Sequence, residues 1–181
     1  MNRFESQVAL VTGGASGIGK ASALAFAAEG ARVVIVDLNR ELGEETASQI
    51  RHQGGEAIFI AANVSQALEC QNIMQRTLEA FGRLDVLFNN AGITRRADVV
   101  NTTEQEWDAV MNTNVKSIFL MCKYAVPIMR TQGGGAIVNT ASGWGILAGK
   151  DAVSYCASKG AVVLLTKAQA IDHGPQKTRV N

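Results

Sequence analysis

The chain has 181 residues, of which 47% are hydrophobic and 18% charged, and its formal net charge at pH 7 is +1. A chain of this length and apolar content can bury a core as one domain, which excludes an intrinsically disordered protein. The sequence holds no block of basic or acidic residues, so the charge pattern does not indicate a nucleic acid or a membrane surface as partner.

Cysteines and apolar runs define the expected compartment. Cys70, Cys122 and Cys156 are far apart and lack the spacing of metal ligands, so we expect reduced thiols and no metal site. The apolar runs are too short for a transmembrane helix, and the first residues lack the apolar segment of a signal peptide. We therefore expect a cytoplasmic protein without membrane contact.

Short β-branched runs alternate along the chain with longer segments of helical period. Strands are expected at residues 8–12, 32–36, 57–61, 84–88 and 136–140, and 178–181 resembles the opening of a sixth strand. Helices are expected at residues 17–29, 41–52, 69–81, 103–131 and 153–171. This alternation predicts an α/β fold, a three-layer, doubly wound parallel sheet of the Rossmann type with helices on both faces.

Pro127 lies inside the long expected helix 103–131. A proline in a helix interior removes one backbone hydrogen bond and clashes with the preceding turn. We therefore expect a kink or a break at this position.

A glycine-rich turn joins the first expected strand to the first expected helix. Residues without a Cβ let the backbone turn tightly and approach a pyrophosphate, and the helix start offers N–H groups and partial positive charge. The glycines are spaced by three residues and then one, unlike the commonest dinucleotide fingerprint, so an ordinary turn stays an alternative. The flanking strand and helix favour a dinucleotide site. The residues assigned to it are Gly13, Ser16, Gly17, Ile18 and Gly19.

Asp37 follows the second expected strand, 18 residues after Gly19. A carboxylate at this place accepts hydrogen bonds from both adenosine ribose hydroxyls and repels the 2′-phosphate of NADP. Ser16 offers no positive charge for such a phosphate. The sequence therefore favours NAD over NADP, although an aspartate that caps the next helix is compatible with the same position.

Four polar residues are expected to meet at the carboxyl end of the sheet. Tyr155 and Lys159 are four residues apart and share one helix face, Ser142 follows the fifth expected strand, and Asn114 lies in the helix 103–131. A tyrosine hydroxyl, with an ordinary pKa of about 10, is a poor base, but an ammonium group one turn away favours its phenolate form. Such a pair can exchange a proton with an alcohol, Ser142 can hold the same oxygen, and Asn114 can support a water chain to the lysine. Each residue alone has an ordinary structural explanation, whereas their joint occurrence favours catalysis.

These motifs resemble those of the short-chain dehydrogenase/reductase family over essentially the whole chain. The resemblance is carried by residues 12–19 (Thr-Gly-Gly-Ala-Ser-Gly-Ile-Gly), 89–92 (Asn-Asn-Ala-Gly) and 155–159 (Tyr-Cys-Ala-Ser-Lys), with Asn114 and Ser142. It implies that Tyr155 is the catalytic acid/base, that Lys159 binds the nicotinamide ribose and assists the tyrosine, that Ser142 polarises the substrate oxygen, and that Asn114 completes a proton relay.

The resemblance also implies further cofactor contacts. Asn90, Ala91 and Gly92 are expected to line the adenosine side of the site, and Tyr155 and Lys159 to contact the cofactor. The family usually carries Asp-Val after the third strand, where this chain has Asn63 and Val64. An amide can both donate to and accept from the adenine edge, so we expect the same contact here.

Members of the family continue beyond residue 181 with a Pro-Gly loop, contacts to the nicotinamide carboxamide, a substrate lid and a further strand. We therefore expect residues 1–181 to form a single dinucleotide-binding domain that contains the catalytic residues and is incomplete at its C-terminus.

The leading hypothesis is an NAD-dependent oxidoreductase that transfers a hydride between the cofactor and a small alcohol or ketone. The alternative is a truncated, catalytically impaired relative that binds NAD without turnover. An epimerase or dehydratase that uses the same tyrosine and lysine is a third possibility, but such enzymes usually carry a large C-terminal substrate domain.

The sequence also suggests a substrate pocket and an oligomer. Residues 157–170 are apolar on more than one helix face, and in the family the two long helices pair across a dimer, so we expect a homodimer or homotetramer. A pocket with apolar sides is expected, in which Arg95 could meet an anion. Its candidate residues are Ile93, Thr94, Arg95, Gly143, Trp144, Ile146 and Leu147.

Overall fold

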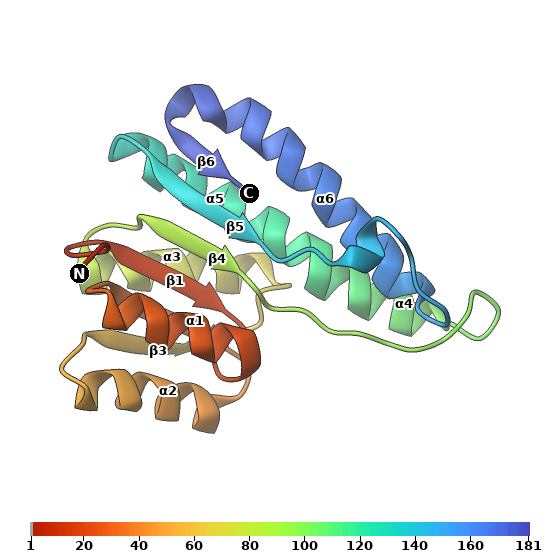
Figure 1. The fold of residues 1–181 in the computed structure, drawn as a ribbon, viewed down its shortest axis with the longest axis horizontal. Coiled ribbons are helices and arrows are strands. Elements are labelled where there is room, and N and C mark those ends of the chain that lie inside the picture. The colour runs from red at the N-terminus through yellow and green to blue at the C-terminus, as the bar shows by residue number, and fades with distance from the viewer. Residues whose placement is uncertain (1) are drawn as a thin grey trace.

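The computed structural model describes residues 2–181, which form a six-stranded parallel sheet in the order β3-β2-β1-β4-β5-β6 (Figure 1). This order is that of the doubly wound dinucleotide-binding sheet, so the predicted fold class is confirmed. The strands are β1 (Val8–Thr12), β2 (Arg32–Asp37), β3 (Ala57–Ala61), β4 (Val86–Asn89), β5 (Gly135–Asn139) and β6 (Thr178–Val180).

The helices cover both faces of the sheet. Helices α1 and α2 pack on one face, and α3, α5 and α6 pack on the other. No helix within residues 2–181 is both long enough and apolar enough to cross a membrane. The helices are α1 (Gly17–Ala28), α2 (Arg40–His52), α3 (Ala67–Phe81), α4 (Glu104–Met111), α5 (Ser117–Thr131) and α6 (Val153–His173).

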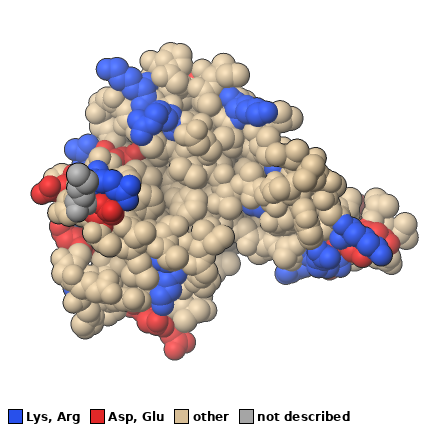
Figure 2. All heavy atoms as spheres, viewed as in Figure 1, with Lys and Arg blue, Asp and Glu red and all other residues tan. Residues whose placement is uncertain are grey.

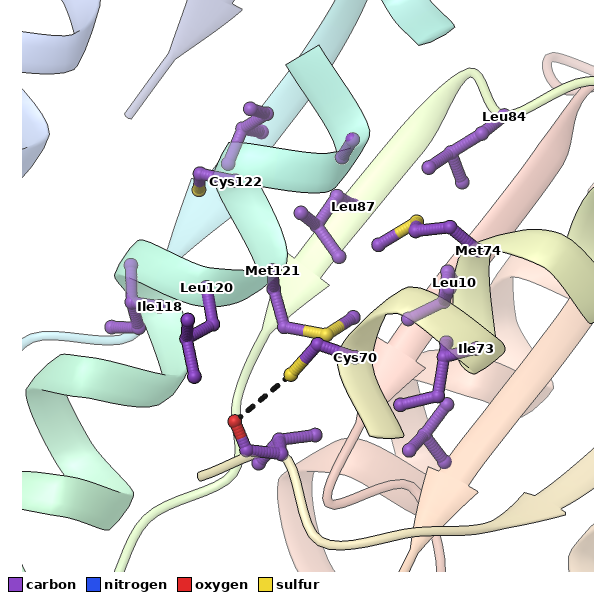
Figure 3. Close-up of a cluster of buried hydrophobic side chains, with 14 of the residues drawn as sticks. Leu10, Cys70, Ile73, Met74, Leu84, Leu87, Ile118, Leu120, Met121 and Cys122 are labelled. Carbon is purple, nitrogen blue, oxygen red and sulfur yellow. Dashed lines mark hydrogen bonds between the residues drawn. The ribbon is translucent and has the colours of Figure 1, made fainter. Parts of the chain in front are cut away.

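Burial on both faces explains why the central strands are continuous apolar runs. All five residues of β1 are buried: Leu10 packs into the cluster with α3 and α5, and its neighbour Val11 packs into the cluster with α1 and α2. Figure 3 shows Leu10 and Leu87 of the sheet facing Met121 of α5 within the first cluster.

Two of the three cysteines, Cys70 and Cys122, lie in this core. All three are free thiols, and Cys70 and Cys122 are buried. Burial raises the pKa of the Cys70 thiol to about 11 and that of Cys122 to about 12, so both stay protonated at neutral pH. The Cys70 thiol donates to the Val64 carbonyl (Figure 3).

Charged side chains lie mainly at the margins of the face shown in Figure 2, and its middle is formed by uncharged residues. This distribution agrees with the absence of charge blocks in the sequence.

The expected element boundaries agree with the structure to within two residues, and the sixth strand pairs with β5. The expected helix 103–131 differs most, because a π-helical turn at Asn112–Lys116 separates α4 from α5. Of the kink or break expected at Pro127, the break does not occur: α5 runs through this residue to Thr131. Val126 and Met129 are buried in the core on either side of Pro127, and their packing holds the helix together there.

We expect Leu87→Ala to lower the free energy of unfolding by about 2–5 kcal/mol, because it removes a fully buried side chain from the main core. Urea unfolding measures this change. The matched control is Leu68→Ala, in which the replaced leucine is 81% exposed on α3, and we expect a change within about 0.5 kcal/mol. Equal effects of the two substitutions would contradict this description of the core.

Candidate active site

The site lies where the chain leaves neighbouring strands toward opposite faces of the sheet. Strands β1 and β4 are paired side by side, but β1 continues into α1 on one face, and the chain beyond β4 leads to α4 and α5, of which α5 packs on the other. Parallel sheets bind ligands at such a switch point, beyond the carboxyl ends of the strands. A cleft of about 410 Å³ lies here, and we call it the dinucleotide cleft. Its lining includes Gly13, Ser16, Gly17, Ile18, Val36, Asp37, Leu38, Ala62, Val64, Asn90, Ala91, Gly92, Ile93 and Thr113.

The glycine turn needs its glycines for backbone reasons. Gly13 and Gly17 have φ angles of +65° and +51°, a region that other residues rarely adopt. A Cβ on Gly19 would lie 2.0 Å from the carbonyl oxygen of Gly13. Gly19 is buried and is not among the residues that line the cleft, so its part is to let α1 pack against the turn.

Asp37, at the end of β2, lines the cleft and also fastens the glycine turn. Its Oδ2 accepts from the backbone N–H of Ala15 at 3.1 Å, and its Oδ1 accepts from that of Asn39 at 3.0 Å. The N-cap of α2 is Asn39, whose side chain accepts from Leu42 N–H. Asp37 is therefore not the cap of the next helix, which removes the alternative explanation of this residue.

The segment after β3 places one of its two expected residues in the cleft. Val64 lines it, whereas Asn63 is not among the lining residues. The Asn63 Oδ1 accepts from both the N–H and the hydroxyl of Ser65, and its N–H donates to Glu69 at 2.6 Å. These bonds give Asn63 a part in shaping the loop.

Asn114 lies fully buried within the π-helical turn. Its Oδ1 accepts from the Ile93 N–H at 2.8 Å, and its Nδ2 donates to the Ile93 carbonyl and to the Ser158 hydroxyl. π-helical turns are frequent at functional sites because they shift the direction of a side chain. Here the turn aims one amide at both the β4–α4 segment and α6.

Lys159 is also buried, next to the Asn114 amide and its hydrogen bonds. Its Nζ donates to the Thr140 carbonyl at 2.6 Å and lies 5.7 Å from the centroid of the Tyr155 ring. Within residues 2–181 it makes no ion pair, and burial lowers the pKa of the ammonium group from its ordinary value. The Thr140 hydroxyl is also buried and without a hydrogen-bond partner in this part of the chain.

A second cavity of about 540 Å³ continues from the dinucleotide cleft, and we call it the substrate cavity. The two share Ile18, Asn90, Gly92 and Ile93. Three of the four predicted catalytic residues, Ser142, Tyr155 and Lys159, line the substrate cavity, together with Thr94, Arg96, Thr140 and Trp144.

Several residues line the two cavities although they were not predicted from the sequence, and some predicted pocket residues do not line them. Val36, Leu38, Ala62, Thr113 and Thr140 line the cavities, and most of them directly follow or end a strand, which is the signal that could have revealed them. Arg95 is not among the residues that line the substrate cavity, and its side chain donates to the Thr94 carbonyl, whereas Arg96 lines the cavity. Ile146 and Leu147 are exposed and are not among the lining residues. Among residues 2–181, no group of three or more His, Cys, Asp and Glu side chains could hold a metal ion.

Comparison with known proteins identifies the family of this chain. A model of the short chain dehydrogenase family matches residues 7–181. The chain belongs to the short-chain dehydrogenase family. It is 41% identical to the cyclopentanol dehydrogenase of Comamonas sp. (strain NCIMB 9872), over 100% of this chain and 72% of that protein. It is 42% identical to the D-threitol dehydrogenase of Mycolicibacterium smegmatis, over 99% of this chain and 69% of that protein.

A solved structure of NAD⁺-bound xylitol dehydrogenase superposes with a TM-score of 0.96 at 36% identity, covering 99% of this chain and 69% of that one. Relatives named as dehydrogenases of alcohols give this short-chain dehydrogenase a general oxidoreductase role. Members of the family bind a nicotinamide cofactor.

The residues present fit such a cofactor. The turn at Gly13 and Gly17 brings backbone and a helix start to the cleft, as a pyrophosphate requires. An ammonium group has three donors, and a hydrogen bond is found for one of those of Lys159. The remaining donors and the unpartnered Thr140 hydroxyl suit the hydroxyl groups of a ribose.

Burial of the Lys159 ammonium group predicts how the stability of the ligand-free protein depends on pH. Because folding lowers the pKa of Lys159, the unfolded chain binds more protons between the folded pKa and the ordinary value of 10.5. The charge therefore destabilises the fold at neutral pH, and this cost is relieved as pH rises through the folded pKa toward 10.5. We expect Lys159→Met to unfold at higher urea concentration than the unchanged protein at pH 7, and the difference to shrink toward pH 10. A less stable variant at pH 7 would show that the bond to Thr140 compensates the buried charge.

Proposed function

We propose that this chain transfers a hydride between NAD(H) and an alcohol/ketone pair. The observation that carries the proposal is that Ser142, Tyr155 and Lys159 line one cavity that is continuous with the glycine-turn cleft. We further propose that residues 1–181 act as one dinucleotide-binding domain with integrated catalytic residues. The names of the relatives, which refer to cyclopentanol, D-threitol and xylitol, support an alcohol as substrate.

The choice of NAD over NADP follows from Asp37. Its carboxylate lines the cleft at the end of β2, the place at which dinucleotide folds meet the adenosine ribose. A negative charge there attracts ribose hydroxyl donors and repels a 2′-phosphate. The bonds from Ala15 and Asn39 hold this carboxylate in place.

In the proposed mechanism the cofactor, when bound, supplies or accepts the hydride. Tyr155 gives a proton to the carbonyl oxygen during reduction and takes it from the alcohol during oxidation. Ser142 donates a hydrogen bond to the same oxygen and holds it beside the tyrosine. The Lys159 ammonium, beside the tyrosine, donates hydrogen bonds to the ribose hydroxyls of the bound cofactor.

Asn114 is proposed to support the proton relay indirectly, by holding neighbouring segments in place. Its amide bonds go to Ile93 and Ser158, with no direct bond to Lys159 among the described residues. It therefore holds the β4–α4 segment against α6, next to the lysine, and leaves proton transfer to groups around it.

A homodimer or homotetramer is part of the proposal. Phe119 of α5 and Leu164 and Ile171 of α6 are 49%, 68% and 76% exposed, respectively. Large apolar side chains exposed on two neighbouring helices suit a contact with a second copy.

Isothermal titration tests the cofactor. We expect NADH to bind at least about tenfold more tightly than NADPH, and Asp37→Asn to reduce this ratio by about tenfold, because the variant removes the charge but keeps the size of the side chain. The matched control is Asp172→Asn, an exposed position at the end of α6, which should leave the ratio unchanged. Equal affinities in the unchanged protein would overturn the NAD preference, and no binding of either would overturn the proposed function.

Turnover tests the tyrosine. We expect Tyr155→Phe to lower kcat for NADH-dependent ketone reduction by at least about 100-fold while NADH affinity stays the same, since only the proton donor is lost. The chain has two tyrosines, so Tyr124→Phe on α5 is the natural control and should keep its activity. Comparable losses in both variants, or none in Tyr155→Phe, would remove Tyr155 from the mechanism.

A further inference from the structure

One wall of the substrate cavity carries a cation that the proposed hydride transfer does not use. Arg96 lines this cavity together with Ser142, Trp144 and Tyr155. Its guanidinium carbon lies over the Trp144 ring, 5.0 Å from the centroid. Trp144 in turn meets Tyr155 edge-on, with ring centroids 6.0 Å apart. One aromatic side chain therefore joins the guanidinium to the ring that bears the reactive hydroxyl.

The backbone around Arg96 is held on both sides. Ile93 is bonded through its N–H and its carbonyl to the Asn114 amide. The Ala97 carbonyl accepts from the Val153 N–H at 3.3 Å, which ties this segment to the first residue of α6. Figure 1 shows the β4–α4 connection extending beside the segment that leads into α6. The position of Arg96 is thus coupled to the helix that carries Tyr155.

Trp144, which is 36% exposed, packs on the backbone of Gly149 beside this arginine. A Cβ on Gly149 would lie 2.6 Å from two atoms of the indole ring, so the backbone at Gly149 packs directly against it. Stacking on an aromatic ring orients a guanidinium but does not neutralise its charge, and it leaves the planar edge with its N–H donors open.

The charge of Arg96 has no partner in the described chain. Within residues 2–181 it makes no ion pair, and no Asp or Glu is among the residues that line the substrate cavity. The other cation of the cavity, Lys159, is bonded to the Thr140 carbonyl. A cavity with two cations and no carboxylate attracts anions, and a guanidinium matches a carboxylate through two parallel hydrogen bonds.

We propose that the substrate is a hydroxy acid or its oxo acid, whose carboxylate is bound by Arg96 while the reacting oxygen lies at Ser142 and Tyr155. This inference rests on the proposed function, because it assumes that the reacting carbon lies beside those two residues. It makes Arg96 the residue that selects charged over neutral substrates.

The test compares acids with their methyl esters, which lack the negative charge and carry one additional methyl group. Pyruvate, acetoacetate and levulinate are each measured against their methyl esters for NADH-dependent reduction, so that the distance between carbonyl and carboxylate varies. We expect at least one acid to exceed its ester in kcat/KM by about tenfold or more, the size of a charge-assisted pair. Arg96→Gln should remove this ratio, and Arg96→Lys should keep part of it. Arg95→Gln is the control, since that side chain bonds to Thr94 outside the cavity, and should keep the full ratio.

The outcomes separate the two proposals. Faster reduction of the ester in every pair, or the same ratio in Arg96→Gln as in the unchanged protein, overturns the role of Arg96 and leaves the hydride transfer standing. A loss of the ratio in both Arg95→Gln and Arg96→Gln also overturns it, because a general effect of charge would explain the result. No reduction of any acid or ester by a protein that binds NADH counts against the proposed hydride transfer itself, and the inference falls with it.

Discussion

The site depends on the junction between the ends of β1 and β4. The Thr12 hydroxyl accepts from the N–H groups of both Asn90 and Ala91, at 3.0 and 3.1 Å. The Asn90 side chain returns two bonds, to the carbonyls of Thr12 and Gly13. These bonds join the glycine turn to the segment after β4, which leads toward the proposed catalytic residues. Both cavities border Asn90, so their relative position is set at this junction.

A second constraint places α6, which carries Tyr155 and Lys159. The Asn139 amide at the end of β5 donates to Thr166 and Gln169 of this helix and accepts from Asn89 of β4. Apolar packing holds a helix on a sheet without choosing its rotation or its register, whereas paired buried polar groups select one arrangement, because any other leaves them unsatisfied. The Asn114–Ser158 bond applies the same constraint one turn from Tyr155.

Function and stability are in tension at the cavities. Lys159 is a buried cation for which the fold provides a carbonyl, and Arg96 is a stacked cation for which it provides an aromatic ring. Neither forms an ion pair within the described chain. A buried charge without an ion pair lowers the stability of the empty protein, which applies to Lys159, whereas Arg96 is exposed to solvent and carries no such cost.

The sequence by itself determined the fold class, the six strands and the motifs, because the alternation of β-branched and helical segments and the glycine spacing are local properties of the chain. It also placed Ser142, Tyr155 and Lys159 at one edge of the sheet, since parallel strands end on the same side. The tertiary structure decided what depends on packing between distant segments. Three features depend on contacts with other elements. They are the π-helical turn that buries Asn114, the continuous helix at Pro127, and the stacking of Arg96 rather than Arg95 on Trp144. Periodicity along one segment carries no information about those contacts.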